Sequence, residues 1–169
     1  MPEKETLERA HEDEREGKSP STQAGEFVRE EMHHIREGKH GAQSPQQAIA
    51  IGLSKARRAG VKLAPPKEGT TSAATRKKTE RDYTKGQSSS KRKPSGTRSR
   101  AVRKALKRKG HSAASPSALS RHAQASATKR GPASREQAAQ KAVRTKGKLG
   151  LQRAARKAAR TRASHRGGR

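Results

Sequence analysis

The stretch EEMHHIREGKHG, residues 30–41, gathers side chains with which proteins bind metal ions or transfer protons. These side chains are Glu30, Glu31, His33, His34, Glu37 and His40. Imidazole nitrogens and carboxylate oxygens are common ligands of Zn²⁺, and the same groups serve as general acids and bases. Their types therefore raise the hypothesis of a metal site or a proton-transfer site, which their spacing must support.

The spacing does not favour that hypothesis. At 100° per residue, a helix would place His33 about 160° and His34 about 100° from the centre of its apolar face, so the two side chains diverge. Two ligands on one helix need the same side, as i,i+4 spacing provides. His40 follows the predicted helix end at Gly38, so a shared metal would need a large loop rearrangement or a second chain. We therefore expect no metal, no cofactor and no catalytic residue, and interpret the histidines as complementing the helix dipole.

The composition limits the size of any hydrophobic core. Hydrophobic residues make up 27% of the 169 residues and aromatic residues 1%, with one Phe, one Tyr and no Trp. At roughly 25 cal/mol per Å² of buried apolar surface, so few large side chains cannot offset the ordering entropy of the whole chain. The absence of Cys excludes disulfides and thiol catalysis. The composition predicts a small folded part and a longer part that is helical only conditionally.

Charge is distributed unequally along the chain. The formal net charge is +27, yet residues 1–60 contain 10 Lys and Arg against 11 Asp and Glu. Residues 61–169 contain the other 32 Lys and Arg against 4 acids, and Glu136 is the single acid after Gly86. A near-neutral head joined to a strongly cationic tail is typical of a protein that binds a polyanion.

Other functional classes lack support in the sequence. No apolar run approaches the ~20 residues of a membrane span, and the acidic N-terminus lacks a hydrophobic signal segment. No glycine-rich phosphate loop follows a predicted strand, and the Ser and His residues of the tail have no partner acid. We therefore expect a non-enzymatic protein of the cytoplasm that associates with the nucleoid.

Helix signals are clearest in residues 21–66, after a charged N-terminal helix in residues 1–20. One helix should begin at Ser21 or Thr22 and reach about Glu37, and a second should run from Ser44 to Ala59. The sequence Ser-Pro-Gln-Gln at residues 44–47 has the pattern of a capping box. Gly52 lies on the apolar face of the second helix, which indicates close approach of a neighbouring backbone. The expected core is Phe27, Val28, Met32, Ile35, Ile49, Leu53, Ala56, Val61 and Leu63, with Leu7 as a further candidate.

These two helices predict an antiparallel hairpin. A helix–turn–helix DNA reader is the alternative, but the connection of about seven residues exceeds the 3–4-residue turn of that motif. Because the core is small, a homodimer or a protein partner that completes the head is left open.

The run TQAGEFVREEMHHIREGKHGAQSPQQAIAIGLSKARRAGVKLAPP, residues 22–66, resembles a family of small bacterial proteins whose function is unknown. Members of that family pair such a head with a tail rich in Lys, Arg and Ala. The resemblance implies a bacterial origin and brings no activity. In composition, the tail is similar to the tails of linker histones and bacterial histone-like proteins, and ribosomal extensions share that composition.

The remaining residues predict basic helices without an apolar stripe. Residues 67–96 form a basic linker with a short helix ending at Gly86, and residues 97–169 form the cationic tail, interrupted at Gly110, Gly131 and Gly147. Ala, Lys and Arg favour helix, but self-repulsion opposes it until phosphates neutralise the charge. The expected fold is thus all-α, with a tail largely disordered when free.

The favoured function is sequence-independent nucleic-acid binding of a nucleoid-associated or histone-like kind, with DNA before RNA as partner. Nothing in the chain is suited to reading bases. A basic protein associated with RNA or ribosomes is one alternative; a stress or interaction protein that docks a partner through its head is another. The candidate phosphate-binding residues are Arg57, Arg58, Arg103, Lys104, Lys107, Arg108, Lys109, Arg153, Arg156, Lys157 and Arg160.

Overall fold

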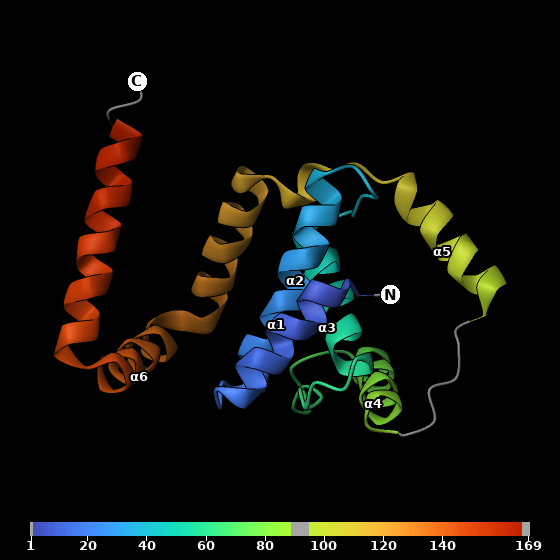
Figure 1. Cartoon of the computed structure of the whole chain (residues 1–169), viewed down its shortest axis with the longest axis horizontal. Coiled ribbons are helices and arrows are strands. Elements are labelled where there is room, and N and C mark those ends of the chain that lie inside the picture. Colours follow the sequence, from blue (N-terminus) through green and yellow to red (C-terminus); the bar gives the residue numbers. More distant parts are fainter. Residues whose placement is uncertain (1, 89–94, 167–169) are drawn as a thin grey trace. The chain divides into compact units, whose positions relative to one another are not determined.

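The computed structural model describes residues 2–88 and 95–166, and all regular elements in them are helices. The elements are α1 (Lys4–Arg15), α2 (Pro20–Arg36), α3 (Pro45–Arg58), α4 (Ala73–Gln87), α5 (Gly96–Lys107), the 3₁₀ helix η1 (Ser112–Ala114) and α6 (Pro116–Arg166). The described residues up to His122 form one compact unit, and those from Ala123 on form another. Figure 1 shows the helices in chain order. The predicted all-α class is confirmed.

Helices α2 and α3 form the centre of the first unit (Figure 1). Helix α1 packs against α2, and α4 packs against α3. The charged N-terminal helix therefore buries part of its surface: Thr6 and Ala10 lie against the hairpin, and Asp13 is 9% exposed. Helix α1 thus covers the α2 part of the hairpin, and α4 covers the α3 part.

The helix ends follow from local sequence signals. Ser44 Oγ accepts a hydrogen bond from Gln47 N at 3.2 Å, and Gln47 Oε1 accepts one from Gln43 N at 2.7 Å. The hydrogen bond to Ser44 is the one that the capping pattern predicts, whereas the side chain of Gln47 reaches the N–H of Gln43, one residue before the N-cap Ser44. Gly38 and Gly60 have φ of 74° and 108°, which lets each helix end in the left-handed region.

Helix α2 begins earlier than the sequence analysis expected. Its N-cap is Ser19, so Pro20 occupies the first helical position. The fixed φ of proline suits that position, and its missing N–H would have no intrahelical partner there. Ser21 and Thr22, the expected caps, lie inside the first turn of α2.

At Gly52, α3 approaches the backbone of α2 closely. A Cβ atom at this position would lie 2.7 Å from Val28 Cα and 2.9 Å from Val28 N. Such distances to backbone atoms are too short for any side chain, so the two helices can pack this closely only because residue 52 is glycine. The prediction drawn from its position on the apolar face is confirmed.

The core consists of two clusters at opposite ends of the hairpin. Phe27 and Ile35 are fully buried, one in each cluster, and every residue of the expected core belongs to a cluster or packs against one. Alanine supplies much of the remainder, through Ala10, Ala24, Ala42, Ala48, Ala56, Ala113 and Ala114. Because alanine is short, these helices pack closely but bury little apolar area per residue.

Residues 106–119 return to cover one end of the hairpin, a contact that the sequence analysis missed. Gly41 N donates a hydrogen bond to Leu106 O at 3.0 Å, and Ala42 N donates one to Gly110 O at 3.1 Å. Arg36 Nε donates to Ala114 O at 3.0 Å. Ala113 and Ala114 are buried in the same cluster as Ile35, and Leu119 packs against it. Part of the expected tail therefore belongs to the head.

Helix α6 is interrupted at two glycines. Gly131 has φ 74° and ψ 169°, and Gly147 has φ 62° and ψ 177°, so neither residue is helical. The stops predicted at these glycines are confirmed, and Pro132 directly follows the first. The residues of α5 and α6 are helical in the structure, and the disorder expected of the free tail stays a prediction. Among the described helices, none combines the length and apolar character needed to cross a membrane.

We predict that Gly52→Ala destabilises the head by about 1–3 kcal/mol, because the added methyl group must push apart two backbones. Chemical denaturation followed by circular dichroism measures this change. Gly25→Ala on α2 is the control, since no atom lies within 4 Å of its would-be Cβ. The control should stabilise the helix by up to about 1 kcal/mol. Equal effects of the two substitutions would contradict the role assigned to Gly52.

Candidate functional site

Nine of the eleven candidate phosphate-binding residues lie exposed on or directly after α5 and on α6. They are Arg103, Lys104, Lys107, Arg108, Lys109, Arg153, Arg156, Lys157 and Arg160. We call these the exposed tail cations. The first five belong to one unit and the last four to the other, so they form two separate groups.

Arg57 and Arg58 lie in a different environment. Arg57 is 8% exposed, and its Nε donates to Leu63 O at 3.1 Å. Burial lowers the pKa of its guanidinium, while the charge of Asp82 opposes that shift. Arg58 Nε donates to Ser54 O at 3.2 Å and lies 3.7 Å from Asp82 Oδ1. Both side chains therefore hold the end of α3 in place, against Leu63 and α4.

Within the described residues, ion pairs are confined to residues 3–82, which comprise the head, the connection after it and α4. Arg9 Nε contacts Glu26 Oε2 at 2.7 Å, and Lys18 Nζ contacts Asp13 Oδ1 at 2.7 Å. In contrast, none of the described Lys and Arg side chains of α5 and α6 forms an ion pair. Glu136 is the one acid there, and Gln140 Nε2 donates to its Oε1 at 3.4 Å. The positive charge of the tail is thus not compensated within the described chain.

A buried ionic cluster lies between α2 and α3. Lys55 Nζ contacts Glu31 Oε2 at 2.7 Å and Glu30 Oε1 at 3.2 Å. The side chains of Glu30 and Glu31 are 1% and 0% exposed, and that of Lys55 is 18% exposed. Glu31 occupies the apolar face because the hairpin provides it with this lysine. Since two carboxylates share one ammonium group, the buried part of the cluster has one negative charge in excess.

Two of the three histidines join this cluster. His40 Nε2 lies 3.3 Å from Glu31 Oε1, and His34 Nδ1 lies 3.8 Å from Glu30 Oε1. The rings of His34 and His40 are 6.0 Å apart at an interplanar angle of 82°. His33 is exposed, as its position on the helix predicted. The expectation that His40 lies too far away was wrong, because the connection after Gly38 turns back towards α2.

The N-terminal residues close the cluster on its solvent side. Glu3 Oε1 accepts a hydrogen bond from His34 Nε2 at 2.8 Å and one from Lys39 Nζ at 3.1 Å. The hydrogen bond from His34, followed by that from Lys39, lowers the pKa of the Glu3 carboxyl from 4.5 to about 2. Glu3 N donates to Glu30 Oε2 at 3.1 Å. Four segments of the chain therefore meet at the cluster: residue 3, α2, residues 39–41 and α3.

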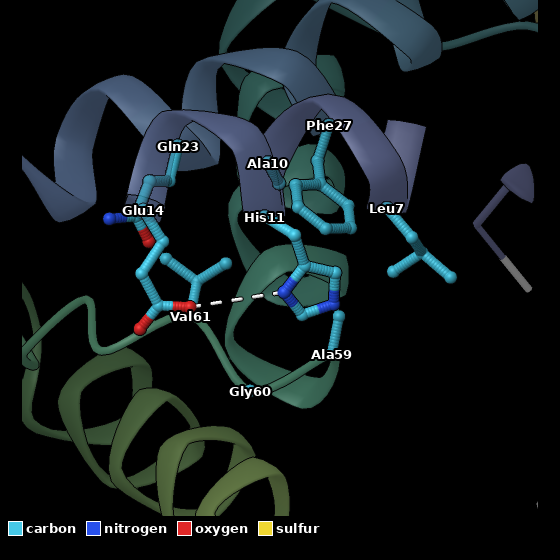
Figure 2. Close-up of a pocket in the computed structure, with 9 residues that line it drawn as sticks. All are labelled: Leu7, Ala10, His11, Glu14, Gln23, Phe27, Ala59, Gly60 and Val61. Atoms are coloured by element: carbon cyan, nitrogen blue, oxygen red, sulfur yellow. Dashed lines mark ion pairs between the residues drawn. The ribbon is translucent and has the colours of Figure 1, made fainter. Parts of the chain in front are cut away.

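A pocket at the other end of the hairpin is too small for a metabolite. Figure 2 shows Leu7, Ala10 and His11 of α1 over Phe27 of α2 and Val61. The cavity measures about 70 Å³, against roughly 300–1,000 Å³ for ligand sites. His11 Nδ1 lies 3.8 Å from Glu14 Oε2 at its rim (Figure 2). Its small size indicates a packing gap between α1 and the hairpin.

Residues 19–68 match the model of a family of unknown function (DUF6496). The matched segment contains α2, α3 and the connection that carries His40, and it ends before α4. The resemblance seen in residues 22–66 is thus confirmed. No curated protein and no solved structure matches the chain.

We predict that Lys55→Met destabilises the protein by about 3 kcal/mol, because Glu30 and Glu31 would remain buried without a cation. Denaturant unfolding measures the loss. Lys62→Met is the matched control: Lys62 pairs with Glu14 at 3.5 Å, and its side chain is 69% exposed. Surface pairs contribute little, so the control should change the free energy of unfolding by at most about 0.5 kcal/mol. If Lys55→Met also lowered the free energy of unfolding by at most about 0.5 kcal/mol, the buried ion pairs would not be needed for stability.

The lowered pKa of Glu3 predicts a pH effect of known sign. A carboxyl with a lower pKa in the folded state stabilises the fold above its unfolded value of 4.5, and this contribution is lost as pH falls towards 2. Glu3→Gln should therefore reduce the free energy of unfolding at neutral pH, and the difference from wild type should vanish on acidification. Unfolding curves across that range test this, with Glu5→Gln on exposed α1 surface as control. A difference that persists at pH 2 would contradict it.

Proposed function

We propose that the protein binds nucleic acid without sequence preference, with duplex DNA as its main partner, through Lys and Arg contacts to phosphates. The observation that carries this proposal is the uncompensated charge of α5 and α6. Their exposed cations form no ion pairs within the described residues, and the tail after Gly86 has 25 Lys and Arg against one acid in the sequence.

Counterion release makes such a surface bind DNA. Duplex DNA carries one negative charge per ~1.7 Å of axis and a condensed layer of cations, which bound Lys and Arg side chains displace. A cation already paired with a carboxylate contributes less, because its charge is compensated before DNA arrives. The head cations Arg9, Lys18 and Lys55 are paired in this way, and the exposed tail cations are not.

The side-chain inventory favours phosphate contact over base recognition. Phe27 is fully buried in the core, and Tyr83 on α4 is the other aromatic residue of the sequence. Single-stranded nucleic acids are typically held by stacking on several aromatic side chains, which this chain lacks. Helices rich in Ala, Lys and Arg instead present positive charge on short or flexible side chains, so they can lie along a groove of a duplex or between two duplexes. A nucleoid-associated, histone-like role in the cytoplasm follows from this proposal.

A second candidate, binding to RNA or to ribosomes, uses the same surface. Both polyanions present phosphates, and the exposed tail cations have no feature that selects deoxyribose. The compact head, with its compensated charge, does not contribute to either contact in this proposal. Comparison of duplex DNA with duplex RNA in one assay separates the two candidates.

We predict that affinity for duplex DNA falls steeply with salt, and that part of this dependence comes from α6. The slope of log K against log salt changes by about 0.9 for each phosphate that the protein no longer neutralises. Replacing Arg153, Arg156, Lys157 and Arg160 together by Gln should therefore lower the slope by up to about 4. Fluorescence anisotropy with a labelled duplex across a salt series measures it.

The matched control replaces four ion-paired cations of the head, Lys4, Lys18, Lys39 and Lys62, by Gln. Both variants have the same net charge, so they separate a local surface from the total charge of the chain. The control should keep the wild-type slope. An equally reduced slope in both variants would contradict the assigned surface, and affinity independent of salt would contradict the mechanism. Tighter binding to duplex RNA than to duplex DNA would favour the second candidate.

A further inference from the structure

We propose that Glu31, His34 and His40 together bind one divalent transition-metal ion, for which Zn²⁺ is the probe. One potential ligand atom from each residue lies within 4.8 Å of the other two. Two imidazoles and one carboxylate are a common ligand set for zinc, and nitrogen ligands disfavour Mg²⁺ and Ca²⁺. The site lies in the head and does not depend on nucleic-acid binding.

The hydrogen bonds of the two histidines leave the correct nitrogens free for a metal. His34 Nε2 lies 2.8 Å from Glu3 Oε1, and a carboxylate can only accept, so this nitrogen carries the proton. His40 Nδ1 lies 3.3 Å from the backbone oxygen of Gly41, which fixes its proton in the same way. His34 Nδ1 and His40 Nε2 then have lone pairs, and both face the buried glutamates. Metal-binding histidines typically donate their other N–H to a carboxylate or a carbonyl.

The carboxylate of Glu31 needs a positive charge on its second oxygen. Oε2 contacts Lys55 at 2.7 Å, whereas Oε1 faces His40 Nε2 at 3.3 Å. Both oxygens are buried, and among the described residues Oε1 has no hydrogen-bond donor comparable to the lysine at Oε2. Two lone pairs that face each other repel unless a proton or a metal ion lies between them. Because Glu30 and Glu31 share one lysine, a bound cation also compensates their excess negative charge.

The separation of two of the three donor atoms suits zinc. Zinc bonds to nitrogen and oxygen of about 2.0–2.2 Å in a tetrahedron place neighbouring donor atoms roughly 3.3 Å apart. The distance of 3.3 Å between Glu31 Oε1 and His40 Nε2 matches that spacing. The side chains of His34 and His40 are 12% and 15% exposed, so an ion can enter from solvent and a water molecule can complete its coordination.

Isothermal titration of the full-length protein with ZnCl₂ tests the proposal. We expect one saturable site at neutral pH. His34→Ala and His40→Ala should each weaken binding at least about 10-fold, since each removes one of three ligands. His33→Ala is the matched control: it lies on the same helix, next to His34, but is exposed. It should bind Zn²⁺ like wild type.

Two further measurements keep the test independent of folding. Circular dichroism checks that each variant retains its helices, and His40→Ala changes only a residue in the connection. Substitution with Co²⁺ should give the visible absorption of a four-coordinate ion in wild type and in His33→Ala, and lose it in the other two variants. Absence of saturable Zn²⁺ binding, or binding that survives His34→Ala and His40→Ala, would overturn the proposal.

Discussion

The contact of two helix backbones at Gly52 is the constraint on which the head depends. It brings α3 so close to α2 that Lys55, one turn further along, reaches two carboxylates on the opposite helix. Without this approach, Glu30 and Glu31 would be buried without a cation, at a cost the small core could not offset.

Charge divides the molecule into parts that follow different physical rules. In the head, Lys55 and Arg9 are matched by glutamates within about 3 Å, so the unit can be compact despite its many ionic groups. The cations of α5 and α6 are not matched in this way, because Glu136 is the one acid of the sequence after Gly86. Electrostatic repulsion there is not relieved within the described residues, whereas in the head it is relieved within the fold. The two behaviours coexist because the acids are concentrated before residue 60.

The elements that depend on neighbours in sequence could be predicted, and those that depend on distant contacts could not. The helix ends at Gly38 and Gly60, the cap at Ser44 and the close approach at Gly52 follow from local signals. The sequence contains no signal for the return of Ala113 and Ala114 to the core, because short alanines give no apolar periodicity. Likewise, helical angles placed His33 and His34 correctly but say nothing of how a connection folds, so His40 was misplaced. The guanidinium of Arg57 donates its hydrogen bond to the backbone oxygen of Leu63, which is six residues away and outside α3. A helical pattern does not show this contact.

The breaks in α6 have a mechanical consequence. An unbroken helix of the 51 residues of α6 would be a rod of roughly 75 Å at 1.5 Å per residue. A straight rod touches a curved duplex over a short length and then departs from it. Gly131 and Gly147 divide α6 into two pieces of about four turns and a third of about five turns, joined by single non-helical residues (Figure 1). Such a chain can change direction at each joint, and under the proposed function its charges would stay near phosphates that follow a curved or bent path.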